Sequence, residues 1–224
     1  MPKPPPEITI VDFDAGNLHS VNRALRAVGQ RTRITSDPRD VDRAEALVLP
    51  GVGSAQDAMR KLNERDLVAS LREYAASGRP FLGVCVGLQL LFDGSEEGGG
   101  VECLRILPGR VRRFADQPGL KVPQIGWNSV RLRDPAHPLV DGIPDGTYFY
   151  FVHSYYAEPA QPEVALGVTD YGSDFAAIVA SHNVLATQFH PEKSADLGLR
   201  LYANFARLAA AERVLFSVSA DPVH

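Results

Sequence analysis

Apolar and polar positions in the first half of the chain follow two alternating patterns. Residues 8–13 form a short apolar run, and after Asn17 apolar positions recur every three or four residues until Gly29. The first pattern is typical of a buried strand, and the second of an amphipathic helix that Asn17 can cap and Gly29 can end. Strands that alternate with helices predict βαβ units and a parallel sheet. Further strand-like runs lie at residues 31–35, 46–49 and 80–84, and helix-like stretches at residues 66–77 and 86–92.

The pattern changes after Gly94. Short runs rich in β-formers are separated there by glycine and proline, which favours mixed or antiparallel pairing. These runs lie at residues 111–114, 148–152, 164–168 and 176–180; a last apolar run covers residues 184–189 and a helical pattern covers residues 197–211. The expected fold class is therefore α/β, with an open, mostly parallel twisted sheet and flanking helices, plus a smaller mixed or antiparallel β region.

Length and composition fit one globular domain. The chain has 224 residues, of which 45% are hydrophobic and 22% charged, so it can bury a sizeable core. Four of the first six residues are proline, which cannot donate hydrogen bonds to a sheet. We expect a mobile leader over residues 1–6, a single domain over residues 7–212 and a C-terminal tail over residues 213–224.

Charge and cysteine content argue against several classes of protein. The 23 basic residues against 27 acidic ones, a net charge of -4, lack the excess typical of nucleic-acid-binding domains. The start of the chain lacks the apolar core of a signal peptide, and no run of about 18 uncharged apolar residues follows, which predicts a soluble cytoplasmic protein with no membrane partner. The two cysteines form no CxxC pair, so neither a disulfide framework nor a thiolate zinc site is expected.

Cys85 lies between Gly83 and Gly87, where a predicted strand meets a predicted helix. Small residues on both sides allow a nucleophile to occupy a strained turn, and the positive end of the following helix favours a thiolate. The backbone N–H of Val86 would then face a developing oxyanion. The alternative is a buried structural cysteine, but the flanking glycines favour the nucleophile.

His190 and Glu192 offer a general base and a group to orient it. At the end of an apolar strand, residues two apart project to the same side, so we expect the two side chains to lie together, although Pro191 between them indicates that the strand is finishing. The alternative is a solvent-facing turn, of which this dipeptide in isolation is more typical.

Gly51, Val52 and Gly53 follow the third predicted strand, at the edge where open parallel sheets bind ligands. Their backbone N–H groups could supply a second oxyanion donor that faces Cys85. A turn that only needs positive φ explains the glycines equally well. Nucleotide binding has no motif to support it, because the chain contains neither GxxxxGK[ST] nor GxGxxG.

Taken together and in this order, the three motifs resemble those of the class I (triad) glutamine amidotransferases. Residues 83–89 (GVCVGLQ) look like the nucleophile elbow of that family, residues 188–192 (QFHPE) like its His-x-Glu motif and residues 50–53 (PGVG) like its oxyanion strand. The resemblance implies a flavodoxin-like sheet and an enzyme that needs no metal or organic cofactor. It implies a catalytic triad of Cys85, His190 and Glu192, with an oxyanion hole formed by Gly51, Val52, Gly53 and Val86. It also implies that the oxyanion strand can be misoriented until a partner binds its ligand.

Two further runs resemble the glutaminase subunits of imidazole glycerol phosphate synthases: residues 121–128 (KVPQIGWN) and residues 148–156 (YFYFVHSYY). This resemblance implies that L-glutamine is held by Gln89, His153 and Ser154, and that ammonia passes to a separate (βα)₈-barrel cyclase subunit in a heterodimer. The cyclase would use it to form imidazole glycerol phosphate and an aminoimidazole carboxamide ribotide in histidine biosynthesis. Family positions at or near the partner interface match Asn17, Trp127, Tyr150 and Lys193.

The chain departs from that family pattern at Val86 and Leu88, where leucine and methionine are usual, and at Asp14, where many members are uncharged. The first two changes replace one apolar side chain by another, and Val86 contributes only its backbone N–H, so we expect catalysis to survive them. The acidic Asp14 bears on the interface alone.

Three alternatives are considered. A glutaminase of another pathway, such as pyridoxal phosphate synthesis, would share the triad but not the runs at residues 121–128 and 148–156. A non-catalytic interaction subunit on the same fold would be expected to lack a triad residue, and all three are present. An α/β hydrolase or cysteine peptidase is disfavoured because no acidic residue lies at a convincing strand end between Cys85 and His190.

Overall fold

The computed structural model describes residues 6–14 and 16–215. Most of the predicted leader and residues 216–224 of the predicted tail lie outside the described residues, as does Ala15. The final helix α6 (Ala195–Leu215) is longer at both ends than the pattern over residues 197–211 predicts.

Four strands from the first half of the chain and one strand near its end, β13, build the parallel part of the main sheet. Its strands lie in the order β2-β1-β3-β4-β13, and each runs parallel to its neighbour. Their bounds are β1 Ile8–Val11, β2 Thr32–Thr35, β3 Ala46–Gly51, β4 Phe81–Cys85 and β13 Val184–Thr187. Every residue of β1, β3, β4 and β13 is buried, which explains why these strands are apolar throughout rather than alternating.

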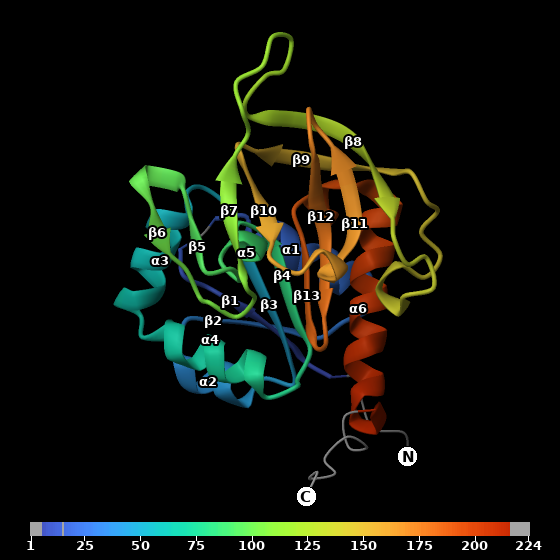
Figure 1. The fold of residues 1–224 in the computed structure, drawn as a ribbon. Helices are drawn as coiled ribbons and strands as arrows, with labels where there is room; N and C mark the ends of the chain where they lie inside the picture. Colours follow the sequence, from blue (N-terminus) through green and yellow to red (C-terminus); the bar gives the residue numbers. More distant parts are fainter. Residues whose placement is uncertain (1–5, 15, 216–224) are drawn as a thin grey trace, which may run out of the picture.

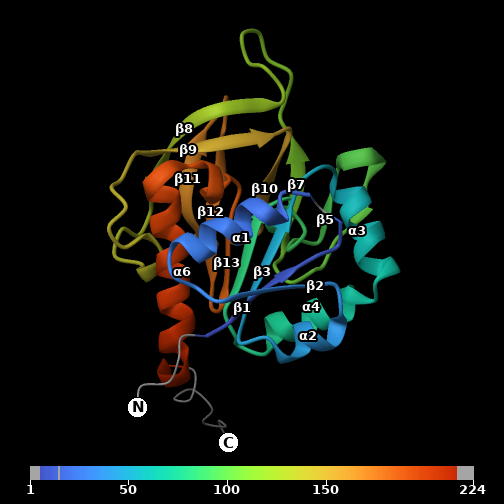
Figure 2. The same ribbon diagram turned by 180° about the vertical axis from the view of Figure 1, so that it is seen from behind.

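Helices cover both faces of this sheet. Helix α1 (Leu18–Ala27) packs with α6 on one face, in front of the strands in Figure 2. Helices α2 (Pro38–Arg43), α3 (Ala55–Glu64) and α4 (Leu67–Ala76) group together at the lower left of Figure 1. Gly29 ends α1 as predicted, in a left-handed conformation with φ 82°.

Two of these helices are missing from the sequence-based prediction. Helix α2 has only six residues, and its start depends on Pro38 and on the side chain of Asp37, which accepts a hydrogen bond from Arg39 N. Helix α3 is mostly polar, but its buried residues recur at helical spacing and Ser54 Oγ caps it through Asp57 N. The signal for α3 was therefore present in the sequence: Ala55, Ala58, Met59 and Leu62.

The second half of the chain extends the main sheet with antiparallel strands, so that within the described residues it has nine strands in the order β2-β1-β3-β4-β13-β12-β11-β8-β9. These strands are β8 Gln124–Leu132, β9 Thr147–His153, β11 Ala165–Asp170 and β12 Asp174–Ser181. A separate small sheet has the order β10-β7-β5-β6, with β5 Gly94–Ser95, β6 Val101–Glu102, β7 Gly109–Arg113 and β10 Tyr155–Pro159. The predicted fold class is confirmed. Beyond that prediction, the structure shows that four antiparallel strands of the second half join the large sheet and four form the small one.

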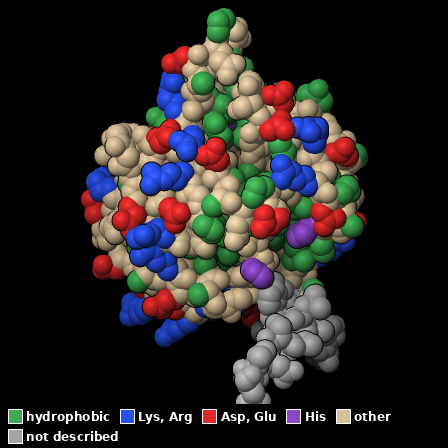
Figure 3. Space-filling model, viewed as in Figure 1, with side chains coloured by type: hydrophobic (Ala, Val, Ile, Leu, Met, Phe, Trp, Pro, Cys, Tyr) green, Lys and Arg blue, Asp and Glu red, His purple; other side chains and the backbone are tan. Residues whose placement is uncertain are grey.

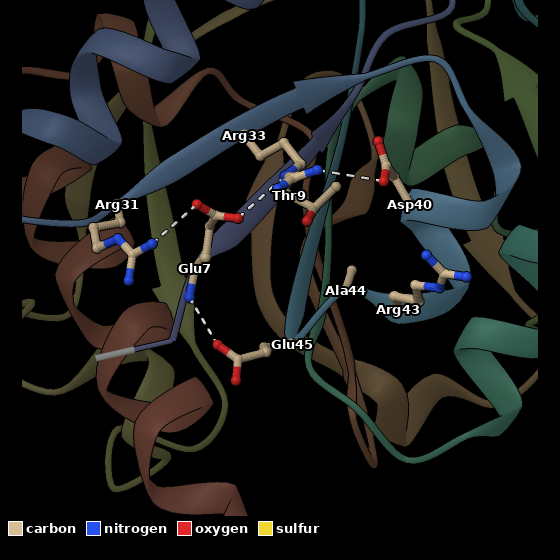
Figure 4. Close-up of a pocket in the computed structure, with 8 residues that line it drawn as sticks. All are labelled: Glu7, Thr9, Arg31, Arg33, Asp40, Arg43, Ala44 and Glu45. Atoms are coloured by element: carbon tan, nitrogen blue, oxygen red, sulfur yellow. Dashed lines mark hydrogen bonds and ion pairs between the residues drawn. The ribbon is translucent and has the colours of Figure 1, made fainter. Parts of the chain in front are cut away.

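A polar concavity lies at the amino ends of β1, β2 and β3 (Figure 4). Glu7 pairs with Arg31 at 3.5 Å and with Arg33 at 3.2 Å, and Arg33 also reaches Asp40 at 3.4 Å. Three arginines and three acidic side chains line this concavity, so its charges balance. These ion pairs tie the edge strand β2 to β1 and α2, at the opposite end of the strands from Cys85.

Figure 3 shows basic and acidic side chains interspersed over one face of the molecule, in keeping with the small net charge. No helix in the described part of the chain is both long and apolar enough to cross a membrane.

Candidate active site

The turn between β4 and α5 (Val86–Gln89) holds Cys85 in a strained conformation, with φ 54° and ψ −110°. Gly87 makes this turn possible, because a Cβ on it would lie 1.9 Å from the carbonyl oxygen of Leu49 in β3. Gly83 is similarly confined, since its Cβ would lie 2.8 Å from the Gly87 oxygen. The nucleophile elbow predicted from the sequence is therefore formed, although α5 ends earlier than the predicted helix over residues 86–92.

His190 and Glu192 form a buried pair. His190 Nδ1 and Glu192 Oε1 are 2.7 Å apart, and the two side chains are 1% and 0% exposed. The predicted strand geometry is wrong: β13 ends at Thr187, and a 3₁₀ turn over Pro191–Lys193 brings the two side chains together. Pro191 fits this turn because it occupies the first helical position, where its missing N–H has no partner to lose.

The imidazole of His190 faces Cys85 with its other nitrogen. Burial lowers the pKa of His190, but contact with Cys85 and Glu192 outweighs burial and raises it to about 10. A thiolate beside the ring and a carboxylate behind it both favour the imidazolium. Gln188 adds a weak contact, with its Nε2 3.8 Å from Cys85 Sγ.

Glu192 is held by two residues besides His190. Asn17 Nδ2 donates to Oε1 at 2.5 Å, and the hydroxyl of Tyr202 in α6 donates to Oε2 at 3.1 Å. Burial raises the pKa of Glu192, but the hydrogen bond and charge of His190 and the hydrogen bond from Asn17 outweigh burial, so the net shift of the pKa is downward. Asn17, which sequence resemblance assigns to an interface, thus also contacts the triad. Sequence reasoning missed Tyr202, because its apolar ring gives only the pattern of a core position.

A cavity of about 250 Å³ opens beside Cys85. It gathers residues from all the predicted motifs, at the carboxyl ends of the parallel strands. Its lining comprises Val52, Gly53, Cys85, Val86, Gln89, Glu97, Pro123, Val152, His153, Ser154, Tyr155 and His190. Gly51 is not in the cavity lining but pairs with Cys85 across the β3–β4 ladder.

Glu97 is a second residue that sequence reasoning missed. It lies in a short 3₁₀ turn after β5, and its Oε2 accepts a hydrogen bond from Ala55 N at 2.6 Å. Burial raises the pKa of its carboxyl group. Its segment, residues 94–100, is rich in glycine and acidic residues and lacks any periodic pattern, so nothing in the sequence marked it.

Gln89 and His153 are both fixed by the backbone of Tyr155. Gln89 Nε2 donates to Tyr155 O at 2.8 Å and to Gln188 Oε1 at 3.2 Å, and Gln89 is part of the cavity lining. His153 Nδ1 lies 2.8 Å from Tyr155 O and therefore carries the proton. Burial lowers the pKa of His153 to about 4, so its ring is neutral at neutral pH.

Strands β8 and β9 present an apolar face to solvent. Ile125, Trp127 and Tyr148 are 63%, 52% and 62% exposed, and Trp127 packs edge-on against Tyr150, its partner across the ladder. Lys193 Nζ lies 5.9 Å from the centre of the Tyr150 ring. Three of the four predicted interface residues thus adjoin one surface, which we call the β8/β9 face: Ile125, Trp127, Tyr148, Tyr150 and Lys193.

An elbow cysteine, a buried His–Glu pair and a strand-end cavity on an α/β sheet define a triad hydrolase of the amidotransferase type. The chain belongs to the glutamine amidotransferase class-I family, whose model matches residues 9–208. The resemblance found in the sequence is confirmed, and the protein is a glutamine amidotransferase.

Similar proteins show to which group within the family this chain belongs. Imidazole glycerol phosphate synthase subunit HisH of Dehalococcoides mccartyi (strain CBDB1) is 48% identical over 206 residues, which cover 92% of this chain and 99% of that protein. The HisH subunit of Moorella thermoacetica is 49% identical over 201 residues, covering 90% and 94%. A crystal structure of a glutamine amidotransferase, 20% identical and covering 90% of this chain and 98% of that one, superposes with a TM-score of 0.70 and supports the fold. Within its family the chain falls in the HisH group.

Gly87→Ala tests the close approach of the elbow to β3. The added Cβ has no room beside the Leu49 carbonyl, so we expect a loss of more than about 3 kcal/mol in the free energy of unfolding, or no folded protein at all. Urea unfolding followed by circular dichroism measures the loss.

Gly29→Ala is the matched control. A Cβ there meets nothing within 4 Å, so only the positive φ opposes it, at about 1 kcal/mol. A loss in Gly87→Ala no larger than that in Gly29→Ala would show that the close contact with β3 does not make Gly87 necessary.

Proposed function

We propose that this chain is the glutaminase subunit of an imidazole glycerol phosphate synthase. It hydrolyses L-glutamine to glutamate and ammonia and delivers the ammonia to a cyclase subunit. The observation that carries the proposal is the buried His190–Glu192 pair beside an elbow cysteine at the mouth of a cavity. The names of the HisH relatives support the choice of pathway over other glutaminases.

The reaction runs in two acyl-transfer steps. The Cys85 thiolate attacks the side-chain amide of glutamine, and the tetrahedral intermediate expels ammonia after His190 gives its proton to the departing nitrogen. His190 then takes a proton from water, which attacks the γ-glutamyl thioester and releases glutamate. Glu192 orients the imidazole and stabilises its charged form throughout.

Backbone N–H groups stabilise the oxyanion in both steps. Val86 N–H lies at the start of α5, and the segment Gly51–Gly53 provides a second donor from β3. Because the two segments are neighbours in the sheet, with Gly51 opposite Cys85, both donors can reach one oxygen.

Recognition of glutamine needs groups for both of its charges. The carboxylate of Glu97 is the acidic side chain in the cavity lining and suits the substrate ammonium, while backbone N–H groups around His153 and Ser154 suit the carboxylate. The side-chain oxygen of Gln89 can accept a hydrogen bond from the substrate. No metal or cofactor takes part.

The β8/β9 face is proposed as the docking surface for the (βα)₈-barrel cyclase. An exposed cluster of tryptophan, tyrosine and isoleucine with a lysine at its side has the composition of an interface centre. It lies beside the triad, because Tyr150 O accepts a hydrogen bond from His190 N at 3.0 Å. Ammonia released at Cys85 would then have a short path to the partner.

Glutamate release from glutamine tests the activity, with and without the matching cyclase and its phosphoribulosyl ligand. We expect strong stimulation by the liganded cyclase and a loss of at least about 10³-fold in Cys85→Ala. Cys103→Ala is the matched control, because burial raises the pKa of that thiol to about 12 and leaves it unreactive. Activity indifferent to the cyclase would assign the chain to another pathway, and no activity under any condition would refute a glutaminase.

Glu97→Gln tests substrate recognition. Loss of the negative charge removes the partner of the substrate ammonium, so we expect KM for glutamine to rise about tenfold with little change in kcat. Ser54→Ala is the control: it also removes a side-chain acceptor at the start of α3 but lies outside the cavity lining. A similar rise of KM in both variants would indicate that Glu97 acts only by capping α3.

Trp127→Ala tests the docking surface. We expect cyclase binding to weaken by about 2 kcal/mol or more, roughly thirtyfold in Kd, while Cys85 keeps its reactivity towards iodoacetamide. Isothermal titration calorimetry gives the affinity. The control Ile34→Ala removes another exposed apolar side chain, on β2 at the opposite edge of the main sheet. Unchanged affinity of Trp127→Ala would exclude the β8/β9 face as the centre of the interface.

A further inference from the structure

The hydroxyl of Tyr202 reaches the active site from the last helix. Tyr202 is fully buried in α6, and its hydroxyl donates to Glu192 Oε2 at 3.1 Å. Burial and the negative charge of Glu192 raise the pKa of Tyr202 well above its usual value, so the hydroxyl keeps its proton and remains a donor. A tyrosine at a core position costs the desolvation of a hydroxyl, and this bond compensates for it.

The two oxygens of Glu192 have different partners. Oε1 contacts both His190 Nδ1 and Asn17 Nδ2. Within the described part of the chain, Tyr202 is the one side chain that bonds Oε2. A carboxylate with no exposed surface depends on such donors to stay charged. An oxygen without a hydrogen bond would keep the full desolvation penalty of burial.

Tyr202 also determines the direction in which the carboxylate points. The terminal torsion of a glutamate side chain is broad, so bonds at one oxygen alone leave the plane of the carboxylate poorly defined. A second bond at the other oxygen, from a side chain packed in the core, fixes that plane. Oε1 is then held towards His190 Nδ1 before the reaction begins.

We propose that Tyr202 is a positioning residue of the triad, which holds the Glu192 carboxylate in the plane that stabilises the His190 imidazolium beside the Cys85 thiolate. Its part in turnover rests on the proposed function, but its effect on the thiolate does not. Two titratable side chains face Glu192, His190 from the 3₁₀ turn and Tyr202 from α6, and Asn17 adds an uncharged donor from the start of α1. The ammonium of the adjacent Lys193 lies over the Tyr150 ring.

Alkylation of Cys85 by iodoacetamide as a function of pH tests the proposal without glutamine or cyclase. In Tyr202→Phe the imidazolium loses support, so the thiolate should form only at higher pH, and alkylation at neutral pH should slow about tenfold. In the complex with liganded cyclase, kcat for glutamine should fall about tenfold while KM changes less than about twofold. Asn17→Gly, in which glycine accepts the φ of 62° found at Asn17, removes the other donor and should shift the alkylation profile in the same direction.

Tyr74→Phe is the matched control, since that hydroxyl is also buried and bonds a backbone oxygen, Pro80 O, at 3.1 Å. We expect it to keep the wild-type alkylation profile even where it lowers thermal stability as much as Tyr202→Phe does. A wild-type profile in Tyr202→Phe would overturn the proposal, and so would equal shifts in both tyrosine variants. A shifted profile in an enzyme without glutaminase activity would support Tyr202 and refute the proposed function.

Discussion

The contact between Gly87 and the Leu49 carbonyl is the constraint on which the active site depends. Only a residue without a Cβ lets α5 lie so close to β3, and that approach forces the chain to turn sharply at Cys85. The strained cysteine then lies at the carboxyl end of the parallel strands, buried but in the lining of the cavity, next to the segment that follows β3. The central position of β4, buried on both faces, over-determines this geometry and allows the strain to persist.

Sequence patterns predicted these parts well because each is local. A strand, two glycines two residues from a cysteine and a following helix are read within nine residues, and the His-x-Glu spacing within three. The parallel order of the strands also follows from their alternation with helices. The antiparallel extension was harder, because residues 124–132 form a strand in which Ile125 and Trp127 point outward and Val130 is buried, contrary to the usual pattern. Ile125 and Trp127 lie on the surface, so the rule that apolar side chains point into the core does not predict their positions.

The contacts of residues that reach the site from distant segments, such as Asn17 and Glu97, could not be predicted from the sequence for a different reason. Asn17 and Glu192 are 175 positions apart, and only the folded sheet brings α1, the turn after β13 and α6 together. Glu97 approaches the cavity from a glycine-rich segment whose course depends on the small sheet. The need for such residues arises only on folding. A buried charge must be paired with hydrogen-bond donors or opposite charges, and these come from whichever segments the tertiary structure places beside it.

The β8/β9 face and the catalytic pair share one piece of backbone. Tyr150 turns its ring outward, while its N–H donates to Ser194 Oγ and its oxygen accepts from His190 N, both at 3.0 Å. On either side of it, Phe149 and Phe151 point inward and pack against Phe189, the residue before the catalytic histidine. Strand β9, which contributes exposed Tyr148 to the aromatic surface, therefore also holds the backbone of His190 in place through main-chain hydrogen bonds and ring packing.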